Sequence, residues 1–244
     1  MMYVLLHFSF MTIAENVARI RQRMAAAARR AGRGTDETVL MAVTKTHSPE
    51  MIREAYEAGI RVFGENRVQE FAGKADVLRD LSHAEWHMIG HLQSNKATKA
   101  VELFAAVDSV DSVKLAQRLE DAAAGAGKTL DVLIEINIGG EEAKSGVRPG
   151  SRELEELLQA AEGLEHLRLR GLMTVPPFTD DPEAARPYFR KLCRLRDEIR
   201  ARHLPRIGMD LLSMGMSHDF EVAIEEGSTC VRVGTAIFGE REKQ

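Results

Sequence analysis

A lysine follows the first strongly apolar segment of the chain. Residues 39–44 read VLMAVT, and Lys45 comes directly after them. Side chains alternate along an extended segment, so Lys45 shares a face with Val43 and Met41. If that face is the interior of a barrel, the amine is partly desolvated, its pKa falls, and it can attack a carbonyl carbon to form a Schiff base. A lysine that simply extends to solvent is the alternative, and Lys45 taken alone favours it.

Two glycine-containing segments near the C-terminus also follow apolar runs. Residues 213–217 read SMGMS, directly before an expected helix, and residues 232–235 read RVGT. Ser217 and Thr235 supply hydroxyl groups, and Gly215 and Gly234 allow a ligand to approach the backbone closely. Ser217 as a plain helix cap, with the glycines as plain turns, is the alternative. Two such segments together with Lys45 favour a phosphorylated aldehyde as the ligand.

Arg232 lies within the last apolar segment. It shares a face with Cys230 and Gly234 and lies opposite Val231 and Val233. An arginine on so apolar a segment needs a partner. That partner is either a carboxylate such as Glu135 or a ring nitrogen of the ligand, and the sequence leaves both open.

Eight short apolar segments alternate with helical patterns. Alternation of this kind predicts a parallel sheet covered by helices, and eight units predict a single (β/α)8 TIM-type barrel. The site is then expected where the strands end, with phosphate after strands seven and eight. An open Rossmann-like sheet is the alternative, but the GxGxxG turn that it prefers does not occur in the sequence. The expected strands are residues 39–44, 60–63, 86–89, 105–110, 130–138, 167–175, 210–213 and 229–233.

The barrel domain is expected to span residues 12–240. Thr12 and Glu15 form a capping-box pattern that begins a helix to about residue 31. Residues 1–11 form an apolar extension that is too short to span a bilayer and lacks the features of a secretory signal. Residues 1–10 are expected to be dispensable, and residues 241–244 to form a polar tail.

Composition narrows the class of protein. The formal net charge is −4 and aromatic residues make up 5% of the chain, so neither suggests a nucleic-acid partner. Cys193 and Cys230 are far apart, which favours neither a disulfide framework nor a zinc site, and no metal ligand set is predicted. These features fit a cytoplasmic protein that does not bind membranes, and a monomer is the default expectation.

Taken together, the motifs resemble those of one family, over residues 12–239 in order. The chain is similar to the pyridoxal phosphate homeostasis proteins. The resemblance implies an alanine racemase N-terminal-domain-like barrel and the cofactor pyridoxal 5′-phosphate (PLP). It also implies a role in intracellular vitamin B6 and amino-acid homeostasis without established catalytic turnover. The matching strings are AVTKTHS, FGENRVQE, WHMIGHLQSNK, GLMTV, LSMGMSHDF and VRVGTAIFG.

The resemblance also assigns roles to single residues. Lys45 would carry PLP as an aldimine, and Arg232 would face the pyridine nitrogen. Ser217, Gly234 and Thr235 would hold the phosphate.

Three further positions follow from the same resemblance. Asn66 would lie beside the ring. Lys144 of the KSG string would be a second or transient cofactor site. The chain departs from the pattern at His47, where many relatives have a second lysine, so a role for that lysine does not carry over.

Three functions compete at this point. The first is a non-catalytic PLP carrier, for which PLP-dependent apoenzymes would be transient recipients. The second is a PLP-dependent amino-acid racemase, which would need a second base such as a tyrosine from an added domain. No added domain is expected here, and the tyrosines are Tyr3, Tyr56 and Tyr188. The third is a Schiff-base aldolase acting on a sugar phosphate, with Asp108, Asp111 or Glu135 as its acid–base group.

Overall fold

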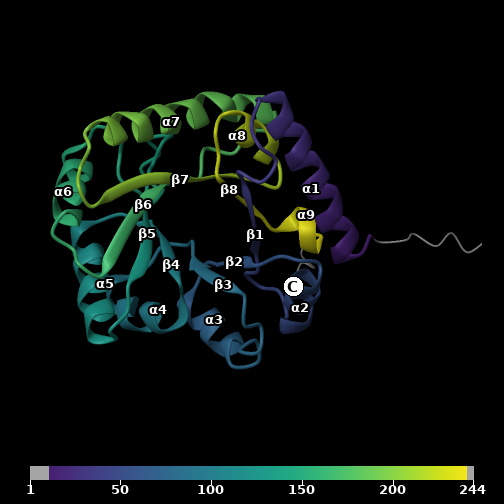
Figure 1. Ribbon diagram of the computed structural model, residues 1–244, viewed down its shortest axis with the longest axis horizontal. Coiled ribbons are helices and arrows are strands. Elements are labelled where there is room, and N and C mark those ends of the chain that lie inside the picture. The colour runs from purple at the N-terminus through teal and green to yellow at the C-terminus, as the bar shows by residue number, and fades with distance from the viewer. Residues whose placement is uncertain (1–10, 241–244) are drawn as a thin grey trace, which may run out of the picture.

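Eight parallel strands close into a barrel in which each strand pairs with the next along the chain and β8 pairs with β1 (Figure 1). The structure, a computed structural model, describes residues 11–240. The predicted (β/α)8 barrel is confirmed. The strands are β1 Val39–Val43, β2 Val62–Glu65, β3 Glu85–Met88, β4 Ala106–Val110, β5 Leu130–Glu135, β6 Leu167–Met173, β7 Ile207–Met216 and β8 Cys230–Val233.

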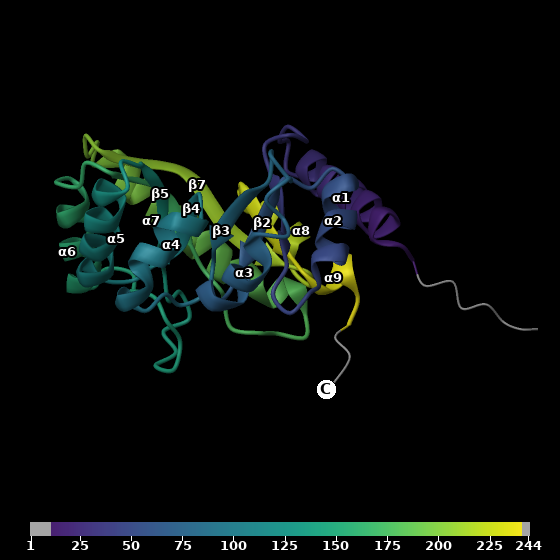
Figure 2. The same cartoon turned by 90° about the horizontal axis from the view of Figure 1, so that it is seen from below.

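Helices surround this barrel on its outside (Figures 1 and 2). α1 precedes the first strand and packs against α8 and α9, the last two helices, so the two ends of the domain lie together. The helices are α1 Ile13–Arg30, α2 Pro49–Glu57, α3 Val68–Ala75, α4 Ala97–Leu103, α5 Val113–Gly125, α6 Arg152–Ala161, α7 Arg186–Ala201, α8 Phe220–Glu225 and α9 Thr235–Phe238. Short 3-10 turns, η1 Ser94–Lys96 and η2 Pro182–Ala185, precede α4 and α7.

The predicted start of the first helix is confirmed. The Thr12 side chain accepts a hydrogen bond from the Glu15 backbone N–H at 3.2 Å, and the Glu15 carboxylate accepts one from the Thr12 backbone N–H at 2.7 Å. This reciprocal pair satisfies two backbone donors that the first helical turn leaves unpaired. The predicted dispensability of residues 1–10 falls outside the described residues.

The barrel interior and the helix-facing core are separate sets of side chains. Leu40 and Ala42 belong to the apolar cluster that also contains the buried faces of the helices. Met41 is fully buried but lies outside that cluster. Because side chains alternate along β1, Met41 and Val43 point into the barrel, and Lys45 continues the same parity. This is the orientation predicted for the lysine.

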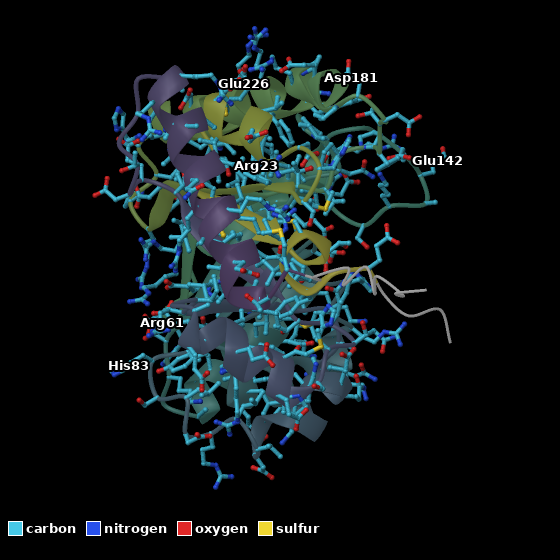
Figure 3. All side chains as sticks on the ribbon, turned by 90° about the vertical axis from the view of Figure 1, so that its right-hand side faces the viewer. Arg23, Arg61, His83, Glu142, Asp181 and Glu226 are labelled. Carbon is cyan, nitrogen blue, oxygen red and sulfur yellow. The ribbon has the colours of Figure 1, made fainter. Side chains whose placement is uncertain are left out.

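The two ends of the barrel can be followed in Figure 3. Glu142 and Asp181, which come after β5 and β6, lie on one side of the molecule, whereas Arg61 and His83, which come before β2 and β3, lie on the other. The end where all eight strands finish is called the mouth below. None of the helices within residues 11–240 is both long and apolar enough to cross a membrane.

Some element bounds differ from those predicted. β5 ends at Glu135 because Ile136 only bridges to Val147, where the segment before α6 folds back. β7 is longer than predicted and irregular, with register shifts against both neighbouring strands. Such irregularities redirect side chains at barrel rims, and here they occur in the strand that leads to Ser217.

Candidate functional site

A cavity of about 660 Å³ opens at the mouth between the exits of β1, β6, β7 and β8. Five of the six residues predicted to bind the cofactor line it, although they come from distant parts of the chain. They are Lys45, Ser217, Arg232, Gly234 and Thr235. The barrel topology therefore brings together one amine, one guanidinium, two hydroxyls and a glycine backbone, which is a donor-rich surface suited to an anionic ligand.

The segment that carries Lys45 is fixed by a buried ion pair on the outside of the barrel. The Lys74 ammonium of α3 lies 2.8 Å from the Glu65 carboxylate and donates a hydrogen bond to the Thr44 carbonyl oxygen at 3.1 Å. The Thr44 hydroxyl donates to the same Glu65 carboxylate at 2.7 Å. Burial raises the pKa of Glu65, while Lys74 and Thr44 oppose that rise. These contacts hold Thr44, the residue immediately before Lys45, in place.

Ser217 joins the exits of β7 and β8. Its hydroxyl oxygen accepts hydrogen bonds from the backbone N–H groups of Gly234 at 3.3 Å and Ala236 at 3.4 Å. The N-cap of α8 is Asp219, so the alternative of Ser217 as a helix cap is wrong. Two N–H groups and a hydroxyl that converge on one point are the donors a phosphate group needs.

Gly215 makes this approach of the two exits possible. It has a φ of +94°, and a Cβ atom there would lie 2.5 Å from the Cβ atom of Ala223. A larger residue would therefore be strained in its backbone and would displace α8.

Arg232 lies inside the barrel and is only 4% exposed. Its guanidinium donates to the Ser213 hydroxyl and to the Thr174 carbonyl oxygen, both at 2.7 Å. Both partners are neutral, and no ion pair is found between Arg232 and Glu135 among the described residues. Burial lowers the pKa of Arg232, opposed by nearby acids, but an arginine stays charged. Val231 and Val233 belong to the helix-facing core, so Arg232 between them points into the barrel. This orientation was predicted from the sequence.

None of the three candidate acid–base carboxylates, Asp108, Asp111 and Glu135, lines the cavity that contains Lys45. Asp108 pairs with His87 at 3.0 Å inside the barrel, and Asp111 pairs with His91 at 3.3 Å. Glu135 ends β5, and its pKa is raised to about 7, chiefly by burial. The geometry therefore gives no support to the aldolase alternative.

Asn66 is not brought to this cavity. It lines a second cavity of about 250 Å³ together with His91 and Lys96. The Asn66 backbone lies against Gly90, where a Cβ atom would be 2.4 Å from the Asn66 carbonyl oxygen. Its side-chain Oδ1 atom is buried without a hydrogen-bond partner in the described part of the chain.

Lys144 lies on the segment after β5, away from the lining of the Lys45 cavity. Its ammonium forms an ion pair with Glu141 and donates to the Pro176 carbonyl oxygen at 3.3 Å. Pro177, the next residue, does line the cavity. Lys144 therefore contacts the rim from outside.

Sequence reasoning missed several residues of the rim. The His47 ring packs on Phe238 with centroids 4.3 Å apart, and Phe178 lies 77% exposed beside His218, at 5.9 Å between ring centroids. His218 also interacts with the Asp180 carbonyl oxygen at 2.9 Å. Phe238 ends α9, but His47, Phe178 and His218 come from loops, where no periodic pattern marks which residues meet.

The tyrosines that could serve as a second base lie elsewhere. The Tyr56 ring packs under the Arg61 guanidinium at 4.1 Å, and Tyr188 on α7 packs against the helix-facing core. Neither lines the cavity, and Tyr3 falls outside the described residues. Residues 11–240 also contain no cluster of three or more histidine, cysteine or acidic side chains that could hold a metal ion.

Known proteins resemble this chain over nearly its whole length. The alanine racemase N-terminal domain family matches residues 14–242. A pyridoxal phosphate homeostasis protein of Aquifex aeolicus is 47% identical over 232 residues, which cover 95% of this chain and 100% of the relative. The protein of the same name from Escherichia coli is 44% identical over 234 residues, covering 94% of this chain and 97% of the relative.

Solved structures agree with these relatives. PipY of Synechococcus elongatus, determined with PLP bound, superimposes with a TM-score of 0.81 at 37% identity and covers 93% of this chain and 100% of PipY. An alanine racemase of Clostridium difficile superimposes with a TM-score of 0.68 at 15% identity, and 58% of that chain is matched. The racemase likeness shows a shared fold alone.

Proposed function

Because the chain belongs to the pyridoxal phosphate homeostasis protein family and has the alanine racemase N-terminal domain fold, we propose that it binds PLP covalently through Lys45. The observation that carries the proposal is that Lys45, Ser217, Gly234 and Thr235 all line one cavity. An amine and a phosphate-type cradle in the lining of one cavity suit a ligand with an aldehyde and a phosphate. The PLP bound in PipY, a relative with 37% identity, is such a ligand.

The phosphate would be held by neutral donors. The Ser217 hydroxyl, the backbone N–H groups of Gly234 and Ala236, and the Thr235 hydroxyl supply these donors at the exits of β7 and β8. Rigid donors of this kind fix the phosphate without large losses of side-chain entropy. Lys45 is then the group that forms the covalent bond.

Arg232 would face the pyridine nitrogen of the cofactor. PLP can stabilise carbanions, and it does so best when that nitrogen carries a proton. Arginine only donates hydrogen bonds, so the nitrogen opposite it must accept one and stay unprotonated. Ser213 and Thr174 hold the guanidinium in this orientation through neutral contacts.

The biological role follows from this chemistry. The protein would hold PLP and buffer this reactive aldehyde, with PLP-dependent apoenzymes as recipients, and so act in vitamin B6 and amino-acid homeostasis. We propose that it does so without steady catalytic turnover, since the described cavity contains one lysine and no tyrosine.

The test is an absorption spectrum of the protein with PLP, before and after borohydride reduction, followed by peptide mapping. We expect a visible Schiff-base band and a reduced adduct on the peptide that contains Lys45. Lys45→Ala should lose both. The matched control is Lys144→Ala, which should keep both. An undiminished adduct in Lys45→Ala, mapped to Lys144 or Lys96, would contradict the proposal.

A further inference from the structure

Glu135 occupies the side of the mouth opposite Lys45. It is the last residue of β5, and three strands lie between β5 and β1 in either direction around the closed barrel. Ile134 and Ile136 belong to the helix-facing core, so Glu135 has the opposite orientation and points inward. Its Oε2 atom is buried and has no hydrogen-bond partner within residues 11–240. A buried carboxyl oxygen without a donor is costly when it is charged.

The charged groups around Glu135 come from three other strands. Arg232 on β8 attracts its charge, Asp111 after β4 repels it, and His91 after β3 attracts it. His91 is already paired with Asp111 at 3.3 Å. On the β6 side the paired residue is Met173, which carries no charge.

Other charged groups also bear on this balance. In the loop after β5, the cation Lys144 is paired with Glu141. Asp108 and Asp219 act on Arg232 as well, so the guanidinium is shared among several acids. Arg232 is nevertheless the strongest attraction that favours the ionised form of Glu135, and its own hydrogen bonds go to neutral groups.

We propose that Glu135 is a further determinant of ligand binding, which takes up a proton when a phosphorylated ligand fills the mouth and so makes retention of that ligand weaken as pH rises. This inference rests on the proposed function, because the ligand is the same phosphorylated aldehyde. The dianionic phosphate would enter the cavity that Arg232 also lines, so it would compete with Glu135 for the attraction of the same guanidinium. A carboxylate can relieve that competition by accepting a proton.

In the protein without ligand, the surroundings of Glu135 already favour its protonated form. Burial, and to a lesser extent Asp111, raise the pKa of Glu135 to about 7. A second negative charge nearby raises it further. Linkage then requires proton uptake on binding between the two pKa values and weaker binding as pH rises through that range.

The experiment compares the wild type with Glu135→Gln, which has nearly the same shape and no charge. PLP is titrated into the full chain between pH 6 and pH 9, and calorimetry in two buffers of different ionisation enthalpy measures the protons taken up. Glu142→Gln is the matched control, because it removes one charge from an exposed residue of the following loop (Figure 3). Glu135→Asp keeps the carboxyl group and should restore the pH dependence. Should Glu135→Gln fail to fold, Glu135→Met supplies the same loss of charge.

We expect PLP affinity to fall about threefold to tenfold more between pH 6.5 and pH 8.5 in the wild type than in Glu135→Gln, as expected for one charge at close range. The proton uptake near pH 7 should be present in the wild type and in Glu142→Gln and reduced in Glu135→Gln. Titration of PLP and of Lys45 is common to all the variants, so it cancels in the comparison. Identical pH profiles and proton uptake in the wild type and Glu135→Gln would overturn the inference and leave the proposed function standing. Failure of PLP to attach to Lys45 in the wild type would instead overturn the proposed function.

Discussion

The hydroxyl oxygen of Ser217 lies 3.3 Å from the backbone nitrogen of Gly234 and accepts its hydrogen bond. This contact joins residues that are 17 positions apart, at the exits of neighbouring strands. It is long for a hydrogen bond, and a second one of 3.4 Å from Ala236 is longer still. Hydrogen bonds this long are weak, so exchanging them for bonds to a phosphate oxygen costs the protein little.

Ser217→Ala is expected to weaken PLP binding by about 1–2 kcal/mol, because one of several donors to the phosphate is lost. Equilibrium titration followed by absorbance measures the effect. Pyridoxal, which lacks the phosphate, should bind much more weakly than PLP and should bind the wild type and Ser217→Ala equally well. Equal affinity of the wild type for PLP and pyridoxal would exclude this phosphate site.

Lys74→Ala is expected to lower the free energy of unfolding by about 3 kcal/mol at pH 8, because it leaves the Glu65 carboxylate buried without its cation. The loss should be smaller at pH 5, where Glu65, whose pKa is raised by burial, can take up a proton instead. Urea unfolding at the two pH values measures both effects.

Lys99→Ala is the control for this prediction. Lys99 pairs with Glu102 on the surface, where the two side chains are 53% and 52% exposed, so its removal should cost less than about 1 kcal/mol. Equal losses for Lys74→Ala and Lys99→Ala would show that the buried pair does not stabilise the β1 exit.

Much of the fold could be predicted because its pattern is local. Each strand is a short apolar run bounded by polar or glycine-containing turns, and the Thr12–Glu15 cap is visible in four residues. The parity of Lys45 and Arg232 follows from alternation along single strands, and the structure confirms both. The predicted ends of helices and strands were less accurate than the predicted elements themselves. The bridge between Ile136 and Val147, which ends β5 early, depends on a contact that no local pattern encodes.

The site was less predictable than the fold. Lys45, Ser217 and Arg232 share a cavity because strands β1, β7 and β8 are neighbours in the closed barrel, which strand counting implies. The placing of Asn66 depends instead on how its backbone packs against Gly90, and it lines a different cavity. Phe178 reaches the rim through a loop without periodicity. Contacts between loops depend on tertiary packing, so a single sequence does not indicate them.

Glu135 should make the stability of the ligand-free protein depend on pH. Its pKa is raised from the ordinary value to about 7 in the folded protein, so the unfolded chain ionises first as pH rises. Glu135 therefore contributes stability at a pH below its pKa in the unfolded chain. This contribution is lost as the pH rises through its pKa in the folded protein. The wild type should lose about 3 kcal/mol between pH 5 and pH 8 that Glu135→Gln does not lose. Urea unfolding at these pH values measures the difference, and parallel stability curves would contradict the prediction.

The protein is expected to be a poor catalyst of amino-acid racemisation. Arg232 is held by Ser213 and Thr174 and is 4% exposed, so it presents a fixed positive charge to any ring placed against it. A permanent cation beside the pyridine nitrogen lowers the pKa of that nitrogen and weakens the cofactor as an electron sink. Racemisation also needs an acid–base group on each face of the ring. Lys45 is in place for one face, while Tyr56 and Tyr188 lie away from the cavity. Incubation with several L-amino acids should therefore give no steady D/L interconversion and at most slow exchange of the α-hydrogen for deuterium. Chiral chromatography and proton NMR measure the two reactions. Multi-turnover racemisation that disappears in Lys45→Ala would show that the chain is an amino-acid racemase instead.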